Sequence, residues 1–137
     1  MLVIEGEGRA FSAGGDLQTI GAAAAADNIA PVVGELLKHY HAFIEAVRRM
    51  PKIVLSSVNG PAAGAGMGLA FVADPCIAAD DARLTPAYAK IGVSPDRGSN
   101  VGMASTGGTR RALQLLLPVD SFTAQPAYDW GLGARVA

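Results

Sequence analysis

Two glycine-rich loops contain the residues whose types and spacing could do chemistry. The first runs from Ser12 to Asp16 and the second from Asn59 to Gly68. Because small residues let backbone N–H groups approach a ligand closely, either loop could hold a polar ligand atom. The second loop leads into an expected helix, whose N-terminal dipole favours negative charge. One N–H donor from each loop could form an oxyanion hole for a polarised thioester carbonyl.

The same glycines also have a plainer explanation, which the residues alone leave open. Glycine-rich turns are usually only turns, and small residues also let a helix and a strand pack closely. The sequence has no G-x-x-x-x-G-K-[ST] phosphate loop, no H-E-x-x-H and no G-x-S-x-G. In Gly64-x-Gly66-x-Gly68 the third glycine comes too early for a dinucleotide fingerprint. We therefore expect neither a metal site nor serine-triad chemistry.

Composition excludes several classes of function. The chain of 137 residues carries 11 basic and 12 acidic residues with no run of either sign, which excludes a polybasic nucleic-acid-binding protein. No stretch approaches the ~18 uninterrupted apolar residues of a membrane span. Cys76 is the single cysteine, which excludes an intramolecular disulfide and a CxxC metal site. Without a recognisable signal peptide, we expect a soluble cytoplasmic protein with one domain, residues 1–137.

Both glycine-rich loops resemble the signature loops of the crotonase superfamily, which comprises the enoyl-CoA hydratases and isomerases. The resemblance lies in residues 5–17 and 58–70, followed in the right order by residues 78–84, 91–98 and 110–117 and by Ala127-x-x-Trp130-Gly131-Leu132. It covers nearly the whole chain. It implies an α/β fold of the crotonase type, a spiral built from β-β-α turns, and an acyl-CoA thioester as the substrate.

The resemblance also implies roles for individual residues. It places the two N–H donors of the oxyanion hole on Gly15 and Ala65. The residues that it places against coenzyme A are Phe11, Ser12 and Ala13, through their backbone, with Asp16 and Leu17 flanking. It implies no metal and no redox cofactor, because coenzyme A arrives as part of the substrate.

The acidic residues narrow the expected reaction. Hydratases of this superfamily use two glutamates, which fall here on Gly68 and Tyr88, so two-glutamate hydration is not expected. Some isomerase-like members instead carry an aspartate in a Ser-Pro-Asp-x-Gly block, which is Asp96 here. One carboxylate is enough to move a proton between carbons of a thioester-stabilised enolate. We therefore expect double-bond isomerisation with Asp96 as the proton shuttle, although Ser94-Pro95-Asp96 is also typical of a helix start.

Two alternatives stay open. Alignment through Asn59-Gly60 places His41 where the related 4-chlorobenzoyl-CoA dehalogenases have a water-activating histidine, and Asp96 where they have a nucleophilic aspartate. Aspartate attack followed by histidine-assisted hydrolysis is coherent chemistry. A single histidine on a helix flank is, however, more often a solvated or packed side chain. The other alternative is a non-catalytic acyl-CoA-binding protein, since both glutamates are absent.

The pattern of apolar residues predicts the elements that must position these groups. Spacings of three and four from Val33 to Val47 predict an amphipathic helix over residues 31–50, with one apolar stripe. A helix rich in small residues is predicted from Gly64 to Ala73. The segment from Ala10 to Leu17 is expected to be a loop, and Ala22 to Ala26 a mobile or weakly helical connector. Alternation of strands and helices predicts right-handed crossovers and a mostly parallel sheet.

Length adds a further expectation. Members of the superfamily are roughly twice as long as this chain and still count as one domain by size. The resemblance therefore implies a core that lacks part of the N-terminal region and the C-terminal helical segment, which closes the site and mediates trimer contacts. It implies a homo-oligomer, a trimer or a dimer of trimers in the family. An uncovered sheet edge and uncovered apolar helix faces also predict self-association or marginal stability.

Overall fold

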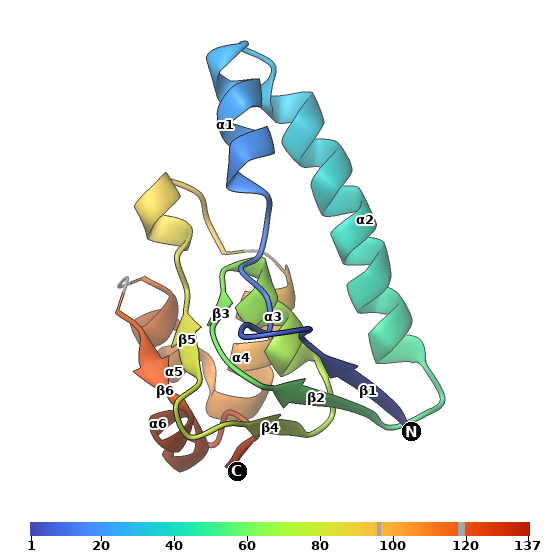
Figure 1. Cartoon of the computed structure of the whole chain (residues 1–137), viewed down its shortest axis with the longest axis vertical. Coiled ribbons are helices and arrows are strands. Elements are labelled where there is room, and N and C mark those ends of the chain that lie inside the picture. The colour runs from blue at the N-terminus through green and yellow to red at the C-terminus, as the bar shows by residue number, and fades with distance from the viewer. Residues whose placement is uncertain (96, 118–119) are drawn as a thin grey trace.

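Two β-sheets form the framework of the protein, whose computed structural model describes residues 1–95, 97–117 and 120–137 (Figure 1). The first sheet is parallel, in the order β1-β2-β4-β7, and consists of β1 (Leu2–Glu5), β2 (Val54–Val58), β4 (Cys76–Ala78) and β7 (Ala134–Val136). The second sheet consists of β3 (Ala62–Ala63), β5 (Arg83–Thr85) and β6 (Phe122–Thr123). Within it β3 and β5 are parallel, and β5 and β6 are antiparallel.

The helices follow the strands in a repeating order. They are α1 (Leu17–Ala25), α2 (Ile29–Arg49), α3 (Ala65–Val72), α4 (Arg97–Gly107), α5 (Thr109–Leu116) and α6 (Ala124–Asp129), with the short 3₁₀ helix η1 (Tyr88–Ile91) before α4. Strand β2 of the first sheet leads to β3 of the second and then to α3, and β4 leads to β5 and then to η1 and α4. This β-β-α order winds the chain into a spiral. The expected α/β spiral and its mostly parallel sheet are therefore confirmed.

Helix α3 lies in the core, as its small and apolar sequence predicts. Met67 is fully buried, and Gly66, Gly68, Ala70, Phe71 and Val72 are buried with it. The hydroxyl of the fully buried Ser56 on β2 donates to the Ala70 carbonyl at 2.6 Å. This bond satisfies a polar group at the interface of β2 and α3, where an unpaired hydroxyl would be costly. Helix α3 can therefore pack closely against the sheet.

Helices α1 and α2 stand side by side and extend away from the sheets (Figure 1). Near the C-terminal end of α2, Ile44 and Val47 are buried in a cluster with Val54 and Val72. In its N-terminal half the exposed fraction of Leu36 is 41%. The predicted apolar stripe of α2 is therefore core only toward its C-terminal end.

Helix α1 begins earlier than the sequence pattern predicts. The sequence predicts a loop at Leu17 and a mobile or weakly helical connector over residues 22–26, but α1 is a regular helix from Leu17 to Ala25. Asp16 caps this helix, because its carboxylate accepts hydrogen bonds from the amides of Gln18 (2.9 Å) and Thr19 (3.3 Å). Alanine has the highest helix propensity, so the capped alanine run continues as a helix.

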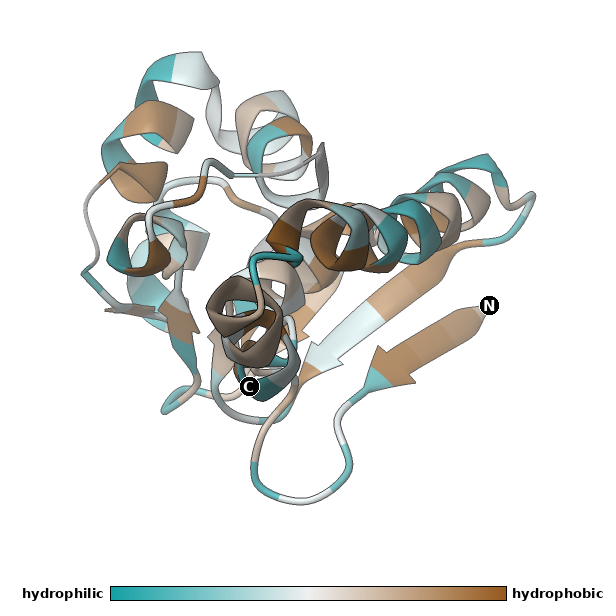
Figure 2. Cartoon of the chain, turned by 90° about the horizontal axis from the view of Figure 1, so that it is seen from above, coloured by the Kyte–Doolittle hydropathy of each residue, from teal (hydrophilic) through white to brown (hydrophobic). Residues whose placement is uncertain are grey.

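Strand β1 forms an edge of the first sheet. Figure 2 shows it, beside the N label, as an apolar strand. Leu2 and Val3 are exposed, and β1 pairs with β2 within the described part of the chain. None of the described helices is both long enough and apolar enough to cross a lipid bilayer.

The position of Leu84 gives a test of this core. Leu84 on β5 is fully buried, so Leu84→Ala is expected to lower the free energy of unfolding by about 2–5 kcal/mol. The matched control is Leu113→Ala, because Leu113 on α5 is half-exposed; its effect should stay within about 0.5 kcal/mol. Urea unfolding followed by circular dichroism measures both. Equal effects of the two substitutions would show that Leu84 does not lie in the core.

Candidate functional site

The two glycine-rich loops, distant in sequence, lie side by side in the structure. Ser12 and Ala62 form a parallel β-bridge, and the Ala63 amide donates to the Ser12 carbonyl at 2.9 Å. The Phe11 amide donates to the Pro61 carbonyl at 3.0 Å. The first loop is thus bonded along the edge of β3, and its backbone position is fixed by the second loop.

Two glycines make this close approach possible. A Cβ atom at Gly66 would lie 2.3 Å from the Ser12 carbonyl oxygen, which is far inside van der Waals contact. At Gly14, whose φ is +89°, a Cβ would lie 2.7 Å from the Ala63 carbonyl oxygen and 3.1 Å from the Ala65 nitrogen. Close packing of the loops is therefore enough to explain both glycines. Close packing also leaves the neighbouring backbone groups of both loops at one surface.

A cavity of about 350 Å³ lies where these loops meet helices α1, α2 and α3. Both expected oxyanion donors, Gly15 and Ala65, line it. The other lining residues near the loops are Ser12, Gly14, Asp16 and Gly66. The helices contribute Ile20, Val33, Leu36, Leu37, Tyr40 and Leu69. A loop surface rich in backbone polar groups therefore faces mainly aliphatic walls.

The amides of Gly15 and Ala65 are available as hydrogen-bond donors. Ala65 is the first residue of α3, where a helix has no acceptor of its own for the amide. Among the described residues, neither amide has a hydrogen-bond acceptor. Two such N–H groups, one of them at a helix N-terminus, can stabilise negative charge on a carbonyl oxygen.

Asp16 combines a place on the cavity with a structural role. Its carboxylate accepts a hydrogen bond from the Thr19 hydroxyl at 2.7 Å, in addition to those from the amides of Thr19 and Gln18. The Thr19 hydroxyl first, and then the two amides, lower the pKa of Asp16 below its ordinary value. The carboxylate is therefore held in its charged form as the N-terminal cap of α1.

The other residues expected against coenzyme A differ in their surroundings. The Phe11 side chain is buried in the core, while Ala13 and Leu17 are exposed. None of these three lines the cavity, whereas Ser12 does. The structure therefore brings Ser12 and Asp16 together with the two expected donors, and it leaves Phe11 only its backbone to offer a ligand.

The two positions on which the resemblance places the hydratase glutamates, Gly68 and Tyr88, both adjoin Ser99. Tyr88 is buried, and its hydroxyl forms a hydrogen bond with the Ser99 hydroxyl. A Cβ atom at Gly68 would lie 2.7 Å from the Ser99 Oγ. Neither position carries a carboxylate: Gly68 has no side chain, and the Tyr88 hydroxyl is bonded to Ser99.

The remaining two candidates are His41 and Asp96. His41 lies on α2, with its ring centroid 5.9 Å from that of Tyr40. Its Nε2 atom is buried and has no hydrogen-bond partner among the described residues. His41 does not line the cavity. Asp96 lies outside the residues that the structure describes, so its assigned role stays a prediction from sequence.

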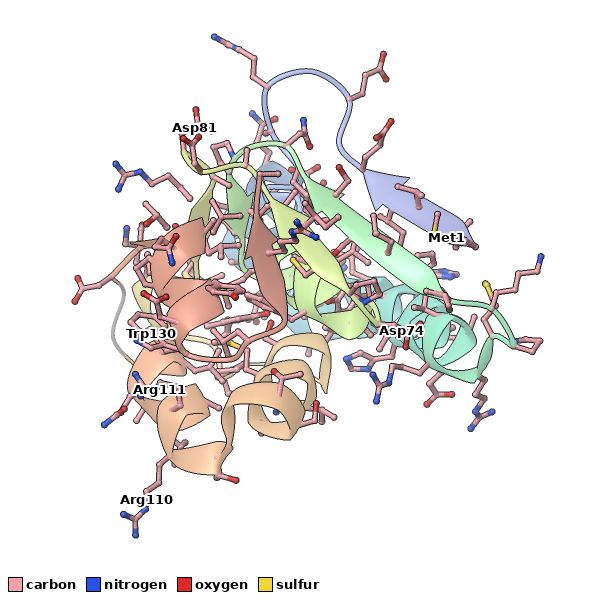
Figure 3. The ribbon with its side chains drawn as sticks, turned by 90° about the horizontal axis from the view of Figure 1, so that it is seen from below. Met1, Asp74, Asp81, Arg110, Arg111 and Trp130 are labelled. Carbon is pink, nitrogen blue, oxygen red and sulfur yellow. The ribbon has the colours of Figure 1, made fainter. Side chains whose placement is uncertain are left out.

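Several other chemically interesting side chains do not line the cavity. Arg111 packs over the ring of Trp130, with its Cζ 5.3 Å from the ring centroid, whereas Arg110 extends away from the fold (Figure 3). Burial raises the pKa of the Cys76 thiol, which fits a core residue rather than a nucleophile.

Sequence reasoning missed the residues that form the walls of the cavity. The spacing of Val33, Leu36 and Tyr40 places them on one apolar helix face, but it gave that face no part in a site. Ile20 lies outside every motif, and Leu69 lies in the block 58–70 that carries the resemblance but was given no role. The available signal for Leu69 was its place one helical turn after Ala65, on the same side of a helix. Spacing could thus group these residues without showing that they border a cavity.

Comparisons with known proteins agree with the observed fold. A family model described as enoyl-CoA hydratase/isomerase matches residues 1–137. The chain is 36% identical to 4-chlorobenzoyl coenzyme A dehalogenase-1 of an Arthrobacter species and 35% identical to 1,2-epoxyphenylacetyl-CoA isomerase of Escherichia coli. The crystal structure of an enoyl-CoA hydratase from Polaromonas sp. JS666 is similar, with a TM-score of 0.86 and 36% identity. This likeness agrees with the expected crotonase-type fold.

The matches cover this chain almost fully but only part of the other proteins. They include 98% of this chain and 49% of the dehalogenase, and 96% of this chain and 50% of the isomerase. The Polaromonas structure is covered to 52% of its length by 98% of this chain. The chain thus spans about half the length of the relatives it matches.

The contact between the two loops can be tested at Gly66. Gly66→Ala places a methyl group against the Ser12 backbone and should lower the free energy of unfolding by about 1–3 kcal/mol. Gly34→Ala is the matched control, since Gly34 also lies in a helix but has no atom near its Cβ position. That substitution should raise the free energy by about 0.5–1 kcal/mol. Thermal unfolding distinguishes the two, and a stabilising Gly66→Ala would contradict the loop contact.

Proposed function

The chain belongs to the enoyl-CoA hydratase/isomerase family, and from this premise we propose that it binds an acyl-CoA thioester and stabilises its enolate. In this proposal the amides of Gly15 and Ala65 donate to the thioester carbonyl oxygen. The observation that carries it is that both residues line one aliphatic-walled cavity and that neither amide has an acceptor among the described residues. Fixed donors stabilise the charge that develops on the oxygen without having to reorganise.

The proposed reaction is migration of a double bond in an enoyl-CoA. The carboxylate of Asp96 removes a proton from the carbon next to the thioester carbonyl, and the electron pair passes into an enolate held by Gly15 and Ala65. The same carboxyl group returns the proton at the far end of the conjugated system. The lack of a carboxylate at Gly68 and Tyr88 supports proton transfer over addition of water. The similarity to a relative named as an isomerase supports it as well.

Coenzyme A enters the proposal as part of the substrate, and no other cofactor is needed. Its proposed neighbours are Phe11, Ser12 and Ala13, through their backbone, with Asp16 and Leu17 flanking. We further propose a homo-oligomer, which is supported by the exposed apolar side chains of Leu36, Leu37 and Phe43 on α2. Cytoplasmic action is part of the same proposal, because a chain with one buried free cysteine suits a reducing compartment.

The proposed reaction is tested by a turnover screen with 3-enoyl-CoA and aryl-CoA thioesters, with binding measured in parallel by calorimetry. The wild-type chain should convert 3-enoyl-CoA to the conjugated 2-enoyl-CoA, which is followed by its absorbance. Asp96→Asn should lower kcat by about 10²–10⁴-fold while leaving binding intact. Asp81→Asn is the matched control, since Asp81 is an exposed residue of the β4–β5 connection (Figure 3).

Two results would contradict this reaction. Full turnover by Asp96→Asn would remove Asp96 from the mechanism. A wild-type chain that binds acyl-CoA thioesters but converts none of them would favour a non-catalytic acyl-CoA-binding protein.

A second candidate function is hydrolysis of an aryl-CoA like that of the dehalogenases. The observation that favours it is the buried Nε2 atom of His41, which has no hydrogen-bond partner in the described chain. The carboxylate of Asp96 would attack the halogen-bearing ring carbon, and chloride would leave. Water activated by His41 would then hydrolyse the resulting aryl ester. The 36% identity to a 4-chlorobenzoyl coenzyme A dehalogenase supports hydrolysis as the second candidate function.

Substitution of His41 distinguishes hydrolysis from isomerisation. If the chain is a hydrolase, His41→Gln incubated with 4-chlorobenzoyl-CoA should release chloride once and accumulate an aryl-enzyme detectable by mass spectrometry. His39→Gln is the control, because His39 lies on the same helix with its side chain exposed. Absence of both chloride release and a covalent adduct in the wild type and in His41→Gln would exclude the hydrolase.

A further inference from the structure

The side chain of Tyr40 occupies a slot between three helices. Its hydroxyl, on α2, donates to the carbonyl of Ala65 on α3 at 2.9 Å. A Cβ atom at Gly68 of α3 would lie 2.7 Å from the Tyr40 Oη, and one at Gly98 of α4 would lie 2.3 Å from it. Glycine at these two positions therefore leaves the space that the phenol group fills.

Ala65 is consequently held from two directions. On its carbonyl side it accepts the Tyr40 hydrogen bond, which links the first residue of α3 to α2. On its amide side it faces Gly14, where a Cβ would lie 3.1 Å from the Ala65 nitrogen. The first loop and α2 thus enclose the backbone of the residue whose amide is the proposed donor from α3.

We propose that Tyr40 is a positioning residue for the oxyanion hole. Its hydroxyl fixes the first turn of α3, so that the Ala65 amide points at the thioester oxygen of a bound acyl-CoA. Tyr40 acts on the thioester oxygen only through Ala65, and this role rests on the function proposed above. Donors in such sites must be held within a fraction of an ångström, so loss of a fixing bond weakens the interaction with the carbonyl more than it weakens binding.

The slot also couples residue 68 to the oxyanion hole. A Cβ atom at this position would lie 2.7 Å from both the Tyr40 Oη and the Ser99 Oγ, so a methyl group here would press the phenol away from the Ala65 carbonyl and would also press on Ser99. Gly68→Ala should therefore reproduce the effect of removing the hydroxyl, although Tyr40 itself is unchanged. Tyr40→Phe removes the hydroxyl itself, whereas Gly68→Ala fills the space that the hydroxyl occupies. Both substitutions therefore act on the hydrogen bond between Tyr40 and the Ala65 carbonyl.

The test is the infrared frequency of the thioester carbonyl in a ¹³C-labelled saturated acyl-CoA, octanoyl-CoA, bound to the protein. With the wild-type chain the band should move to lower frequency than in free octanoyl-CoA, because two N–H donors polarise the carbonyl. Tyr40→Phe and Gly68→Ala should both lose most of this shift. Tyr128→Phe is the matched control, since Tyr128 is exposed and lies outside the cavity, and it should keep the full shift.

Turnover gives a second readout that a merely structural role would not move. Tyr40→Phe should lower kcat for 3-enoyl-CoA by about 3- to 10-fold, the worth of one hydrogen bond, with KM changed by less than about 2-fold. An equal carbonyl shift in the wild type and in both variants would overturn the role of Tyr40 and leave the proposed function standing. A wild-type carbonyl band at the frequency of free octanoyl-CoA would overturn the proposed function, and this inference with it.

Discussion

The backbone contact between the two glycine-rich loops is the constraint on which the rest of the structure depends. The Ser12–Ala62 bridge and the bond from the Ala63 amide to the Ser12 carbonyl join segments that are 50 residues apart in the chain. The contact tolerates almost no side-chain volume, because a Cβ at Gly66 would overlap the Ser12 backbone. The glycines thus serve packing and place amides beside a cavity through the same geometry. Close packing of the loops and the placement of amides beside the cavity are therefore two consequences of a single contact.

Helices α1, α2 and α3 complete the cavity around this contact. The start of α3 leaves the Ala65 amide without an internal acceptor, and α2 holds the Ala65 carbonyl through Tyr40. The first turn of α1, through Ile20, and the N-terminal half of α2, through Val33 and Leu36, add aliphatic walls. As a consequence, apolar residues such as Leu36 stay partly exposed. At the two positions where the resemblance places the hydratase glutamates, Gly68 has no side chain and Tyr88 shares a hydrogen bond with Ser99. The lack of a carboxylate at both positions shapes the chemistry proposed for the site.

The sequence predicted those features that depend on local patterns or on a shared motif. Strand β5 begins at Arg83 and ends at Thr85, as the pattern of residues predicts. The resemblance pairs Gly15 with Ala65, and both residues line one cavity. Helix α1 was predicted only as a mobile or weakly helical connector over residues 22–26, because an alanine run has no apolar periodicity, although Asp16 caps it.

The role of Tyr40 could not be predicted from sequence. Helical spacing groups residues on a face but does not say whether that face meets the core, a cavity or solvent. The slot for Tyr40 depends on Gly68 and Gly98, which belong to two other helices and come together only in the folded chain.

The central claim is that the amides of Gly15 and Ala65 donate to one thioester carbonyl, and proton NMR of the ¹⁵N-labelled chain tests it most directly. The two amide proton resonances should move downfield when octanoyl-CoA binds. They should stay in place when the matching thioether binds, because that analogue lacks only the carbonyl oxygen. The account is contradicted if the two ligands bind and shift these resonances equally, or if octanoyl-CoA binds without moving either of them.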